Sequence, residues 1–345
     1  MDKETKIIVG ISVGDLNGIG LEVILKTFAD KRILDFCTPV IFGSTKVFSY
    51  HKKALQSEVQ SFGIQSLENL QQGKLNLLNV WKEDVNLSIG TPTKDSGIYA
   101  LKSLEAATNA LSEGKIDVLL TAPISKDNIQ SEEFDFPGHT EYLESKLEGE
   151  SLMVLMTEHL RLGLVTGHVP VSKVAETITK ELIVKKVGIM YESLVRDFGI
   201  SKPKIAVLGL NPHCGDNGVI GNEDEDLIRP TLKEIQETGK LVYGPYAADG
   251  FFGSQNYQQF DGVLAMYHDQ GLVAFKTLAF GNGVNFTAGL SGIRVSPDHG
   301  TAFEIAGKGK ADHSSFSEAL HVGLQIFKTR DSSESLRKNS LRVRK

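Results

Sequence analysis

Short apolar runs alternate with longer amphipathic segments along the first part of the chain. Runs rich in β-branched residues predict buried strands at 6–13, 39–44 and 75–81, and the segments at about 20–31 and 46–55 carry apolar residues at helical spacing. Strands that alternate with helices in this way are typical of a parallel or mixed sheet with helices on both faces. The pattern therefore predicts an α/β fold.

The same alternation continues through the rest of the chain. A helix is predicted at 96–115, followed by a buried strand at 116–124 that ends at a proline turn. The segment 151–169 predicts two strands with a hinge at 158–161, and 172–199 predicts one or two amphipathic helices. Further strands are predicted at 204–210, 241–249, 261–270 and 284–296, and further helices at 223–239 and 314–330.

Composition narrows the class of protein. With 345 residues, the chain is long enough for two domains, and 41% hydrophobic with 23% charged residues is ordinary for a globular protein. The formal net charge of -6 gives no field that attracts nucleic acid, so no nucleic-acid partner is expected. Two cysteines and the lack of a recognisable signal segment favour the cytoplasm. No apolar run approaches the roughly 18 residues that cross a bilayer, so no membrane partner is expected.

Polar residues follow the buried strands at five places, where ligands of α/β proteins bind. These segments are GDLNGIG (14–20), TAPISK (121–126), TGH (166–168), NPHCGDNG (211–218) and YHDQG (267–271). The glycines of the first segment lack the Gly-x-Gly-x-x-Gly spacing of a Rossmann turn. This segment is either a tight strand-to-helix turn or a loop whose backbone N–H groups approach an anion or cofactor.

Three histidines each follow a predicted strand. Three neutral imidazoles with an open coordination position make a plausible catalytic site for a divalent metal, which indicates His168, His213 and His268 as candidate ligands. Their separations of 45 and 55 residues match no local zinc motif. The alternative is that each is an ordinary hydrogen-bonded histidine, and that His213 is a passenger in a turn built by Asn, Pro and Gly.

Two further segments have both a structural and a functional interpretation. His139 and Thr140 begin a predicted helix, so Thr140 either caps that helix or joins an imidazole and free N–H groups in a phosphate seat. The glycine-rich segment 294–312 contains His299 and Thr301. It is either a loop with ordinary turn chemistry or a surface on which a flat group such as adenine lies.

Seven sequence blocks together resemble the family of 4-hydroxythreonine-4-phosphate dehydrogenases of the pyridoxal phosphate pathway. They occur in the family's order between about residues 7 and 312, and they are GDLNGIGLE, TAPISK, FPGHTEYL, LNPHCGDNG, GPYAAD, MYHDQGLVAFK and GVNFTAGLSGIRVSPDHGTAFEIAG. The stretch HGTAFEIAGKGKAD (299–312) is also similar to a loop of isopropylmalate and isocitrate dehydrogenases. Those enzymes bind a dinucleotide without a Rossmann domain, which agrees with the glycine spacing of the first turn.

The resemblance implies a fold and an assembly. The fold would be a two-domain α/β/α sandwich of the isocitrate/isopropylmalate dehydrogenase kind, with non-Rossmann dinucleotide binding. Residues 1–127 with 300–345 would form the domain that carries most of the dinucleotide site. Residues 128–299 would form the domain with the metal ligands and the dimer interface. The partner would be a second copy, in a homodimer with active sites at the subunit interface.

The resemblance also assigns roles to residues. The metal, Zn²⁺, Mg²⁺ or Co²⁺, would be held by His168, His213 and His268. The substrate would contact His139, Thr140, Lys276, Asn285 and Arg294, with Asp249 a weaker candidate. The cofactor, NAD or NADP, would contact Gly14, Asp15, Gly18, His299, Gly300 and Thr301. The hydroxyl proton would move through Lys276 or Asp269, which the sequence does not rank.

The chain departs from the usual family pattern at three places. The first turn has Leu16, Asn17 and Leu21 where the family usually has Pro, Ala and Pro. The turn at 211–218 has Cys and Asp at 214 and 216 where Ala and Glu are commoner, and Ser and Gly occupy 291 and 292 where Pro and Phe are usual. The last change lies beside Arg294 and bears on which phosphorylated substrate fits.

The activity that the resemblance implies is the NAD(P)-dependent and metal-dependent oxidation of a phosphorylated hydroxy amino acid, 4-phosphohydroxy-L-threonine. The product is a β-keto acid that loses carbon dioxide. One alternative is a dehydrogenase of another phosphorylated hydroxy acid, such as a four-carbon sugar-acid phosphate. Two others are a non-catalytic metal- or phosphate-binding protein and a phosphotransacetylase-like acyl transferase.

Overall fold

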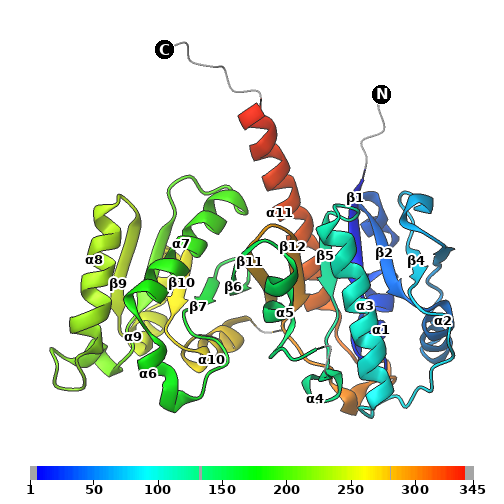
Figure 1. The fold of residues 1–345 in the computed structure, drawn as a ribbon, viewed down its shortest axis with the longest axis horizontal. Coiled ribbons are helices and arrows are strands. Elements are labelled where there is room, and N and C mark those ends of the chain that lie inside the picture. Colours follow the sequence, from blue (N-terminus) through cyan, green and yellow to red (C-terminus); the bar gives the residue numbers. More distant parts are fainter. Residues whose placement is uncertain (1–5, 132–133, 280, 339–345) are drawn as a thin grey trace. The chain divides into compact units, whose positions relative to one another are not determined.

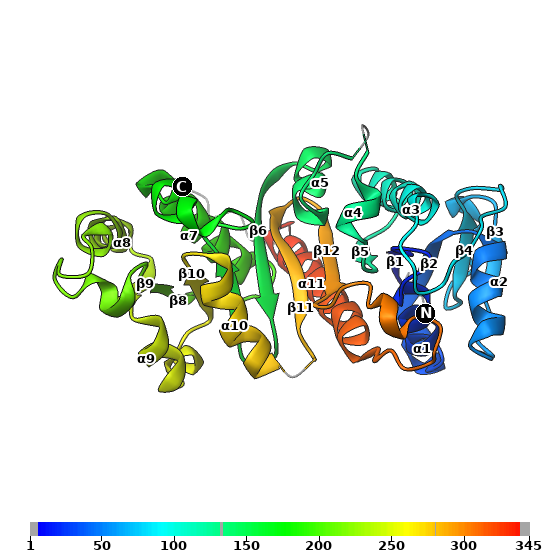
Figure 2. The same cartoon turned by 90° about the horizontal axis from the view of Figure 1, so that it is seen from below.

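The computed structural model describes residues 6–131, 134–279 and 281–338, and Figures 1 and 2 draw its ribbon. It divides into two compact units, which we call unit 1 (1–149 with 290–325) and unit 2 (150–289 with 326–345). Both units are discontinuous in sequence. Each is described separately below.

These boundaries differ from the expected 1–127 with 300–345 and 128–299. Strand β12 (Ile293–Pro297) belongs to unit 1 because it pairs in parallel with β5 (Val118–Thr121). Helix α5 (His139–Lys146) also belongs to unit 1, since it shares a hydrophobic core with α3 (Lys94–Ser112). Strand pairing and packing decide both assignments, and neither can be read from composition.

The sheet of unit 1 is entirely parallel in its described pairings. Its strand order is β3-β4-β2-β1-β5-β12. The strands not yet given are β1 (Ile7–Ser12), β2 (Cys37–Gly43), β3 (Phe62–Ile64) and β4 (Asn76–Asn79). The short strand β3 was not anticipated from the sequence. All other strands of this unit overlap predicted runs, although β2 begins two residues before its run and β12 ends one residue after its run.

Alternation along β2 explains why helices cover both faces of this sheet. Val40 and Phe42 pack in the core formed with α3, whereas Ile41 lines the opposite face with Val47 and Phe48. The latter two belong to α2 (Thr45–Ala54), and α1 (Gly20–Thr27) lies on the same side. Figure 2 shows α3 on one face of the strands and α1 with α2 on the other. A strand buried on both faces accordingly reads as a continuous apolar run.

The sheet of unit 2 is mixed, and its strand order is β11-β6-β7-β10-β8-β9. Strands β6 and β7 pair antiparallel, with the hinge where the sequence predicted it, while β7, β10, β8 and β9 are parallel neighbours. The strands are β6 (Gly149–Met156), β7 (Arg161–Leu164), β8 (Lys204–Leu208), β9 (Leu241–Tyr246), β10 (Gly262–Ala265) and β11 (Val284–Leu290).

Helices cover both faces of this sheet as well. On one side α7 (Lys180–Arg196) approaches the strands closely at two glycines, because a methyl group at Gly163 or Gly262 would lie 3.0 to 3.2 Å from Met190. On the other side, aromatic residues of α9 (Ala248–Gly253) and α10 (His268–Ala279) share a core with β7, β8 and β10. The α/β class predicted from the sequence is confirmed.

Several helices differ from their predicted limits. The 172–199 pattern contains α6 (Val174–Thr177) and α7, separated at Thr179, whose side chain caps α7 by accepting from Leu182 N. The 223–239 pattern opens with a π-helical turn before α8 (Arg229–Glu237). Helix α10 was not predicted, and α11 (Ser314–Lys338) is longer than expected. In the described part of the chain, no helix has the length and apolar character needed to span a membrane.

Candidate functional site

Asp15 fixes the turn that follows β1. Its side chain is 1% exposed and accepts hydrogen bonds from Asn17 N at 2.9 Å, Ser96 Oγ at 3.1 Å and Asn128 Nδ2 at 2.7 Å. At Gly14, φ is +67° and a methyl group would lie 2.3 Å from the Pro123 carbonyl oxygen, so only glycine fits there. The carboxylate was predicted to contact a cofactor. In the structure, these three hydrogen bonds hold the shape of the turn inside unit 1, and the cofactor contact stays a prediction.

The two segments predicted to hold a dinucleotide contact one another. Ile19 N donates to the Thr301 carbonyl oxygen at 3.0 Å, and a methyl group at Gly18 would lie 3.0 Å from that oxygen. Further along, the buried carboxylate of Glu22 accepts from Ala311 N at 2.8 Å. The first turn and helix α1 therefore support the 299–311 segment, which we call the dinucleotide loop.

His299 presents an unsatisfied nitrogen in the dinucleotide loop. Its Nδ1 lies 3.1 Å from the Gly300 carbonyl oxygen, so Nδ1 carries the proton and Nε2 is an acceptor. Nε2 is buried and has no hydrogen-bond partner among the described residues. A buried acceptor without a partner costs free energy, which a donor from a bound ligand would recover. The loop thus fits a group that carries hydroxyl or amino donors, as a dinucleotide does.

A second cluster of unit 1, the Arg294 cluster, consists of Thr121, His139, Glu141 and Arg294. Arg294, on β12, is 2% exposed, and its Nε and Nη2 donate to Thr121 Oγ1 at 3.1 and 2.8 Å. Burial lowers the pKa of this guanidinium to about 9, against the opposing charge of Glu141. The group is still a cation near neutral pH. It provides a buried positive charge that a phosphate or carboxylate could pair.

His139 is neutral in this cluster. Burial, with smaller contributions from the charges of Arg294 and Lys126, holds its pKa well below the ordinary value of 6.5. It begins helix α5, and its Nε2 is buried without a hydrogen-bond partner in the described structure. Thr140 follows in the first turn of the helix. The predicted residues His139, Thr140 and Arg294 therefore all lie in unit 1.

The three histidines predicted as metal ligands all lie in unit 2, but only two of them are together. The rings of His168, after β7, and His268, at the start of α10, have centroids 5.4 Å apart. Within the described ranges no group of three His, Cys, Asp or Glu residues could hold a metal ion. The pair fits two positions of a metal site, while His213 does not join it in a single chain. The expected triad is not assembled here.

The turn that carries His213 has an unusual backbone. His213, Cys214, Asp216 and Asn217 all have φ between +45° and +57°, a region that costs non-glycine residues free energy. The buried carboxylate of Asp224 anchors the turn's start by accepting from the backbone N–H groups of residues 210 and 211 at 2.8 and 2.9 Å. His213 is exposed. The turn therefore presents the imidazole outward from a fixed base.

Helix α10 carries the two candidates for proton transfer. His268 Nδ1 lies 2.7 Å from Asp269 Oδ1, so the carboxylate orients the ring. Asp269 and Lys276 are seven residues apart, which puts both on one face of the helix at a separation of about 10 Å along its axis. Both are exposed. Asn285, predicted as a substrate contact, lies on β11 with a buried Oδ1 that has no partner in the described structure.

Several residues that position the site were missed from the sequence. Gln270 ties α10 to neighbouring strands, because its Nε2 donates to the Gly209 carbonyl at 2.6 Å and its Oε1 accepts from Met266 N at 2.8 Å. Asp224 lies in an acidic run that was read only as the start of a helix. The local sequence pattern does not indicate the contacts of Asp224 with the turn, because these contacts join residues many positions apart.

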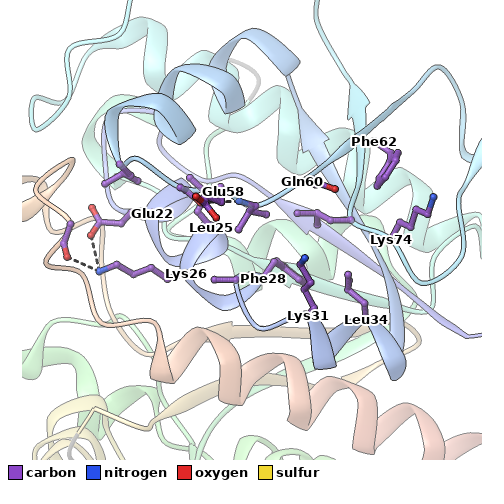
Figure 3. A pocket seen from close by; sticks show the side chains of 16 residues that line it. Glu22, Leu25, Lys26, Phe28, Lys31, Leu34, Glu58, Gln60, Phe62 and Lys74 are labelled. Atoms are coloured by element: carbon purple, nitrogen blue, oxygen red, sulfur yellow. Dashed lines mark hydrogen bonds and ion pairs between the residues drawn. The ribbon is translucent and has the colours of Figure 1, made fainter.

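A cavity of about 1030 Å³ opens elsewhere in unit 1, beside α1 (Figure 3). Its walls include the apolar side chains of Leu25, Phe28 and Phe62. Lys26 reaches along the wall to Glu22, with Nζ 3.1 Å from Oε1, as the dashed line in Figure 3 marks. None of the residues predicted as site residues lines it. The candidate site therefore rests on the strand-end loops and not on this cavity.

Comparison with known proteins gives a consistent result. The family model described as pyridoxal phosphate biosynthetic protein PdxA matches residues 35–323. A 4-hydroxythreonine-4-phosphate dehydrogenase of Bacteroides thetaiotaomicron is 51% identical over 342 residues, covering 99% of this chain and 94% of the relative.

Two further relatives bear on fold and substrate. The crystal structure of a 4-hydroxythreonine-4-phosphate dehydrogenase from Klebsiella pneumoniae matches with a TM-score of 0.80 and 31% identity, covering 93% of this chain and 99% of the other. A protein of Oceanobacillus iheyensis provisionally named D-threonate 4-phosphate dehydrogenase is 37% identical, covering 94% of this chain and 99% of the relative.

Proposed function

Because the chain belongs to the PdxA family of pyridoxal phosphate biosynthetic proteins, we propose that it is an NAD- or NADP-dependent dehydrogenase of 4-phosphohydroxy-L-threonine. The secondary alcohol loses a hydride to the nicotinamide and a proton to a base, which gives 2-amino-3-oxo-4-phosphooxybutanoate. This β-keto acid then loses carbon dioxide to form 3-amino-2-oxopropyl phosphate. The cytoplasm is the proposed location.

The observation that carries the proposal is the Arg294 cluster. A buried guanidinium beside the neutral imidazole of His139 is a receptor for an anionic group, because charge-assisted hydrogen bonds are strongest where water is excluded. Thr140 adds a hydroxyl and the N-terminus of α5 adds backbone N–H groups. We assign the substrate's phosphate or carboxylate to this cluster. Asn285 and Lys276 of unit 2 are further substrate contacts in the proposal.

The dinucleotide is assigned to the dinucleotide loop. His299, Gly300 and Thr301 contact it in the proposal, and the orphaned His299 Nε2 is the observation in favour. The first turn contributes through Gly14 and Gly18, whose lack of a side chain lets the backbone approach closely. Asp15 acts by holding this turn. The bound nicotinamide accepts the hydride.

Proton transfer is assigned to helix α10. Lys276 and Asp269 share one face of the helix and are exposed, so either can exchange a proton with a hydroxyl and with solvent. Asp269 also orients the His268 ring through their 2.7 Å contact. A bell-shaped pH profile that loses its acidic limb in Lys276→Met would support Lys276 as the base, because a base acts only when it is deprotonated.

A divalent cation, Zn²⁺, Mg²⁺ or Co²⁺, is part of the proposal. His168 and His268 supply two ligands from one chain, and His213 is the third. Such an ion would polarise the hydroxyl that is oxidised. Since a single chain leaves His213 apart from the other two, we propose that a homodimer completes the site and that the partner subunit's copy of this turn supplies the third imidazole.

A second candidate substrate is D-threonate 4-phosphate, because one 37% identical relative carries that name. The two compounds differ in an amino or a hydroxyl group at one carbon. The deciding experiment offers each compound with NAD or NADP and follows reduction of the dinucleotide by absorbance. Faster turnover of phosphohydroxythreonine supports the main proposal. Turnover of the threonate alone would replace it, and turnover of neither would reject both.

A further inference from the structure

The side chain of Asn17 holds a loop, residues 88–93, that carries none of the predicted roles. Asn17 is fully buried, and its Nδ2 donates to the Thr91 carbonyl at 3.0 Å and to Thr93 Oγ1 at 3.1 Å. Its Oδ1 accepts from Ser88 N at 2.9 Å, and its backbone carbonyl accepts from Gly90 N at 2.8 Å. Every polar group of this side chain is thus used on the 88–93 loop.

The 88–93 loop packs in turn against the dinucleotide loop. A methyl group at Gly90 would lie 3.0 Å from the Phe303 carbonyl oxygen, and one at Gly307 would lie 2.7 Å from Cγ2 of Ile89. Both glycines have positive φ, at +86° and +71°. Neither loop can therefore shift against the other without a clash or a loss of contact.

We propose that Asn17 is a positioning residue for the dinucleotide, because it fixes the 88–93 loop as a wall against which residues 303–307 of the dinucleotide loop are shaped. The inference rests on the proposed function in one respect, the assignment of the dinucleotide to that loop. Asn17 itself does not contact the ligand. It acts through the six residues of the 88–93 loop, which form no strand or helix. The last of them, Thr93, is the N-cap of α3.

The physical argument concerns what remains when the amide is removed. Asn17→Ala leaves Ser88 N, the Thr91 carbonyl and Thr93 Oγ1 without their buried partner, and the loss of these hydrogen bonds destabilises the packed form of the 88–93 loop. The 88–93 loop would recover part of the lost hydrogen bonding by moving these polar groups toward water. The dinucleotide loop would then lose its wall and sample more conformations, and ligand binding would have to order it again.

The test compares binding of the oxidised dinucleotide to wild-type protein and to Asn17→Ala by titration calorimetry. We expect the Kd to rise about tenfold, which corresponds to about 1.4 kcal/mol. The KM for the phosphorylated substrate should stay within about twofold, because the Arg294 cluster is untouched. Asn86→Ala is the matched control, since this exposed asparagine lies in the preceding segment and should bind the dinucleotide as wild type does.

Trp81 gives a spectroscopic readout of the segment that precedes the 88–93 loop. Trp81 is the single tryptophan of the chain, is 4% exposed, and lies with its ring centroid 4.9 Å from that of Tyr99. The segment from Trp81 leads into the 88–93 loop. The fluorescence emission of Trp81 should therefore shift in Asn17→Ala and should not shift in Asn86→Ala.

A second variant keeps the proposal falsifiable if Asn17→Ala does not fold. Gly90→Ala leaves Asn17 intact and disturbs the same wall from the other side, at Phe303, and it should weaken dinucleotide binding to a similar extent. If either folded variant binds the dinucleotide with wild-type affinity, the inference is overturned. This holds even if the Trp81 emission of that variant has shifted. Failure of the wild-type protein to bind either dinucleotide would instead reject the proposed function, so the two failures are distinguishable.

Discussion

Arg294 holds a positive charge inside unit 1, where burial alone makes a charge costly. Burial lowers its pKa to about 9 against the opposing charge of Glu141, and its Nε and Nη2 donate to Thr121 Oγ1. A phosphate or carboxylate of a ligand would add charge-assisted hydrogen bonds to this group. The residue therefore contributes more to binding than to stability of the unliganded protein.

Arg294→Met tests this role at the residue scale. The methionine keeps much of the apolar volume and removes the buried charge, so we expect the thermal midpoint to stay near that of the wild type. The kcat/KM for the phosphorylated substrate should fall about 10- to 100-fold through loss of charge-assisted hydrogen bonds. Arg32→Met, at an exposed arginine paired with Asp30, is the control and should leave kinetics unchanged. Unchanged kcat/KM in Arg294→Met would contradict the substrate assignment.

His51 is a buried histidine that supports the first turn. It is 3% exposed, and its Nε2 donates to the Leu16 carbonyl at 2.9 Å. Burial lowers its pKa from 6.5 to about 4, and the hydrogen bond to Leu16 and the charge of Glu22 oppose this. The unfolded chain therefore binds a proton at a higher pH than the folded protein does. Stability from this group is fully present above pH 6.5 and declines as the pH falls toward 4.

The expected size of this loss is about 3 kcal/mol by pH 4, from the shift of the pKa. In His51→Gln, the side-chain amide still donates to Leu16 but does not titrate. The free energy of unfolding, measured by urea at about pH 7 and about pH 5, should therefore fall less for the variant than for the wild type. His321→Gln, an exposed site on α11, should keep the wild-type difference. Equal pH dependence in His51→Gln and the wild type would refute this account.

At the scale of elements, the ends of β7, β8 and β10 determine what unit 2 can hold. The sequence identified each strand and the histidine beyond it, because buried strands read as apolar runs and turns as Gly, Pro and Asn. It did not identify α10, whose first residue is His268. The sequence predicted a strand at 261–270 and no element for GLVAFK (271–276), and packing of Phe275 in the core shows the buried face of the helix.

Metal content tests the contribution of these three turns. We expect His213→Ala to lose bound metal and turnover while its fold, monitored by circular dichroism, is unchanged, and we expect the same of His168→Ala and His268→Ala. The reason is that loss of one imidazole leaves too few ligands to hold the ion at an open site. His159→Ala, in the exposed turn between β6 and β7, should keep its metal. Retention of metal by His213→Ala would remove that residue from the site.

At the scale of the whole molecule, the assembly proposed for the metal site can be tested by mixing variants. If His213 acts from the partner subunit, a heterodimer of His168→Ala and His213→Ala has one intact site and one doubly altered site. Random reassortment of the two inactive proteins should then restore about a quarter of wild-type activity. If one chain supplied all three ligands, no site would be intact and no activity would return.

The control for this experiment pairs His168→Ala with His268→Ala. These residues lie in one chain with ring centroids 5.4 Å apart, so each heterodimer site lacks one of them and the mixture should stay inactive. Sedimentation velocity on the wild-type protein gives the oligomeric state independently. A monomer at assay concentration would contradict the proposed dimer.

The sequence by itself determined the class of the fold and the places where chemistry follows a strand. Apolar alternation is a local property, and it specified most strands, the β6–β7 hinge and the turns at residues 14, 166 and 267. The order of the seven sequence blocks indicated the family before any contact was known. His139 was named from its place at a predicted helix start, and Arg294 only from the family resemblance.

Only the tertiary structure decided which of those residues meet. Asp15 turned inward to Ser96 and Asn128, His168 joined His268 but not His213, and Asn17 reached the 88–93 loop. These contacts join residues up to 113 positions apart, and a buried polar group takes whichever partner the fold brings within hydrogen-bond distance. Local pattern carries no information about such distances. For that reason the domain boundaries, the start of α10 and the wall behind the dinucleotide loop emerged only when strands were paired and helices packed.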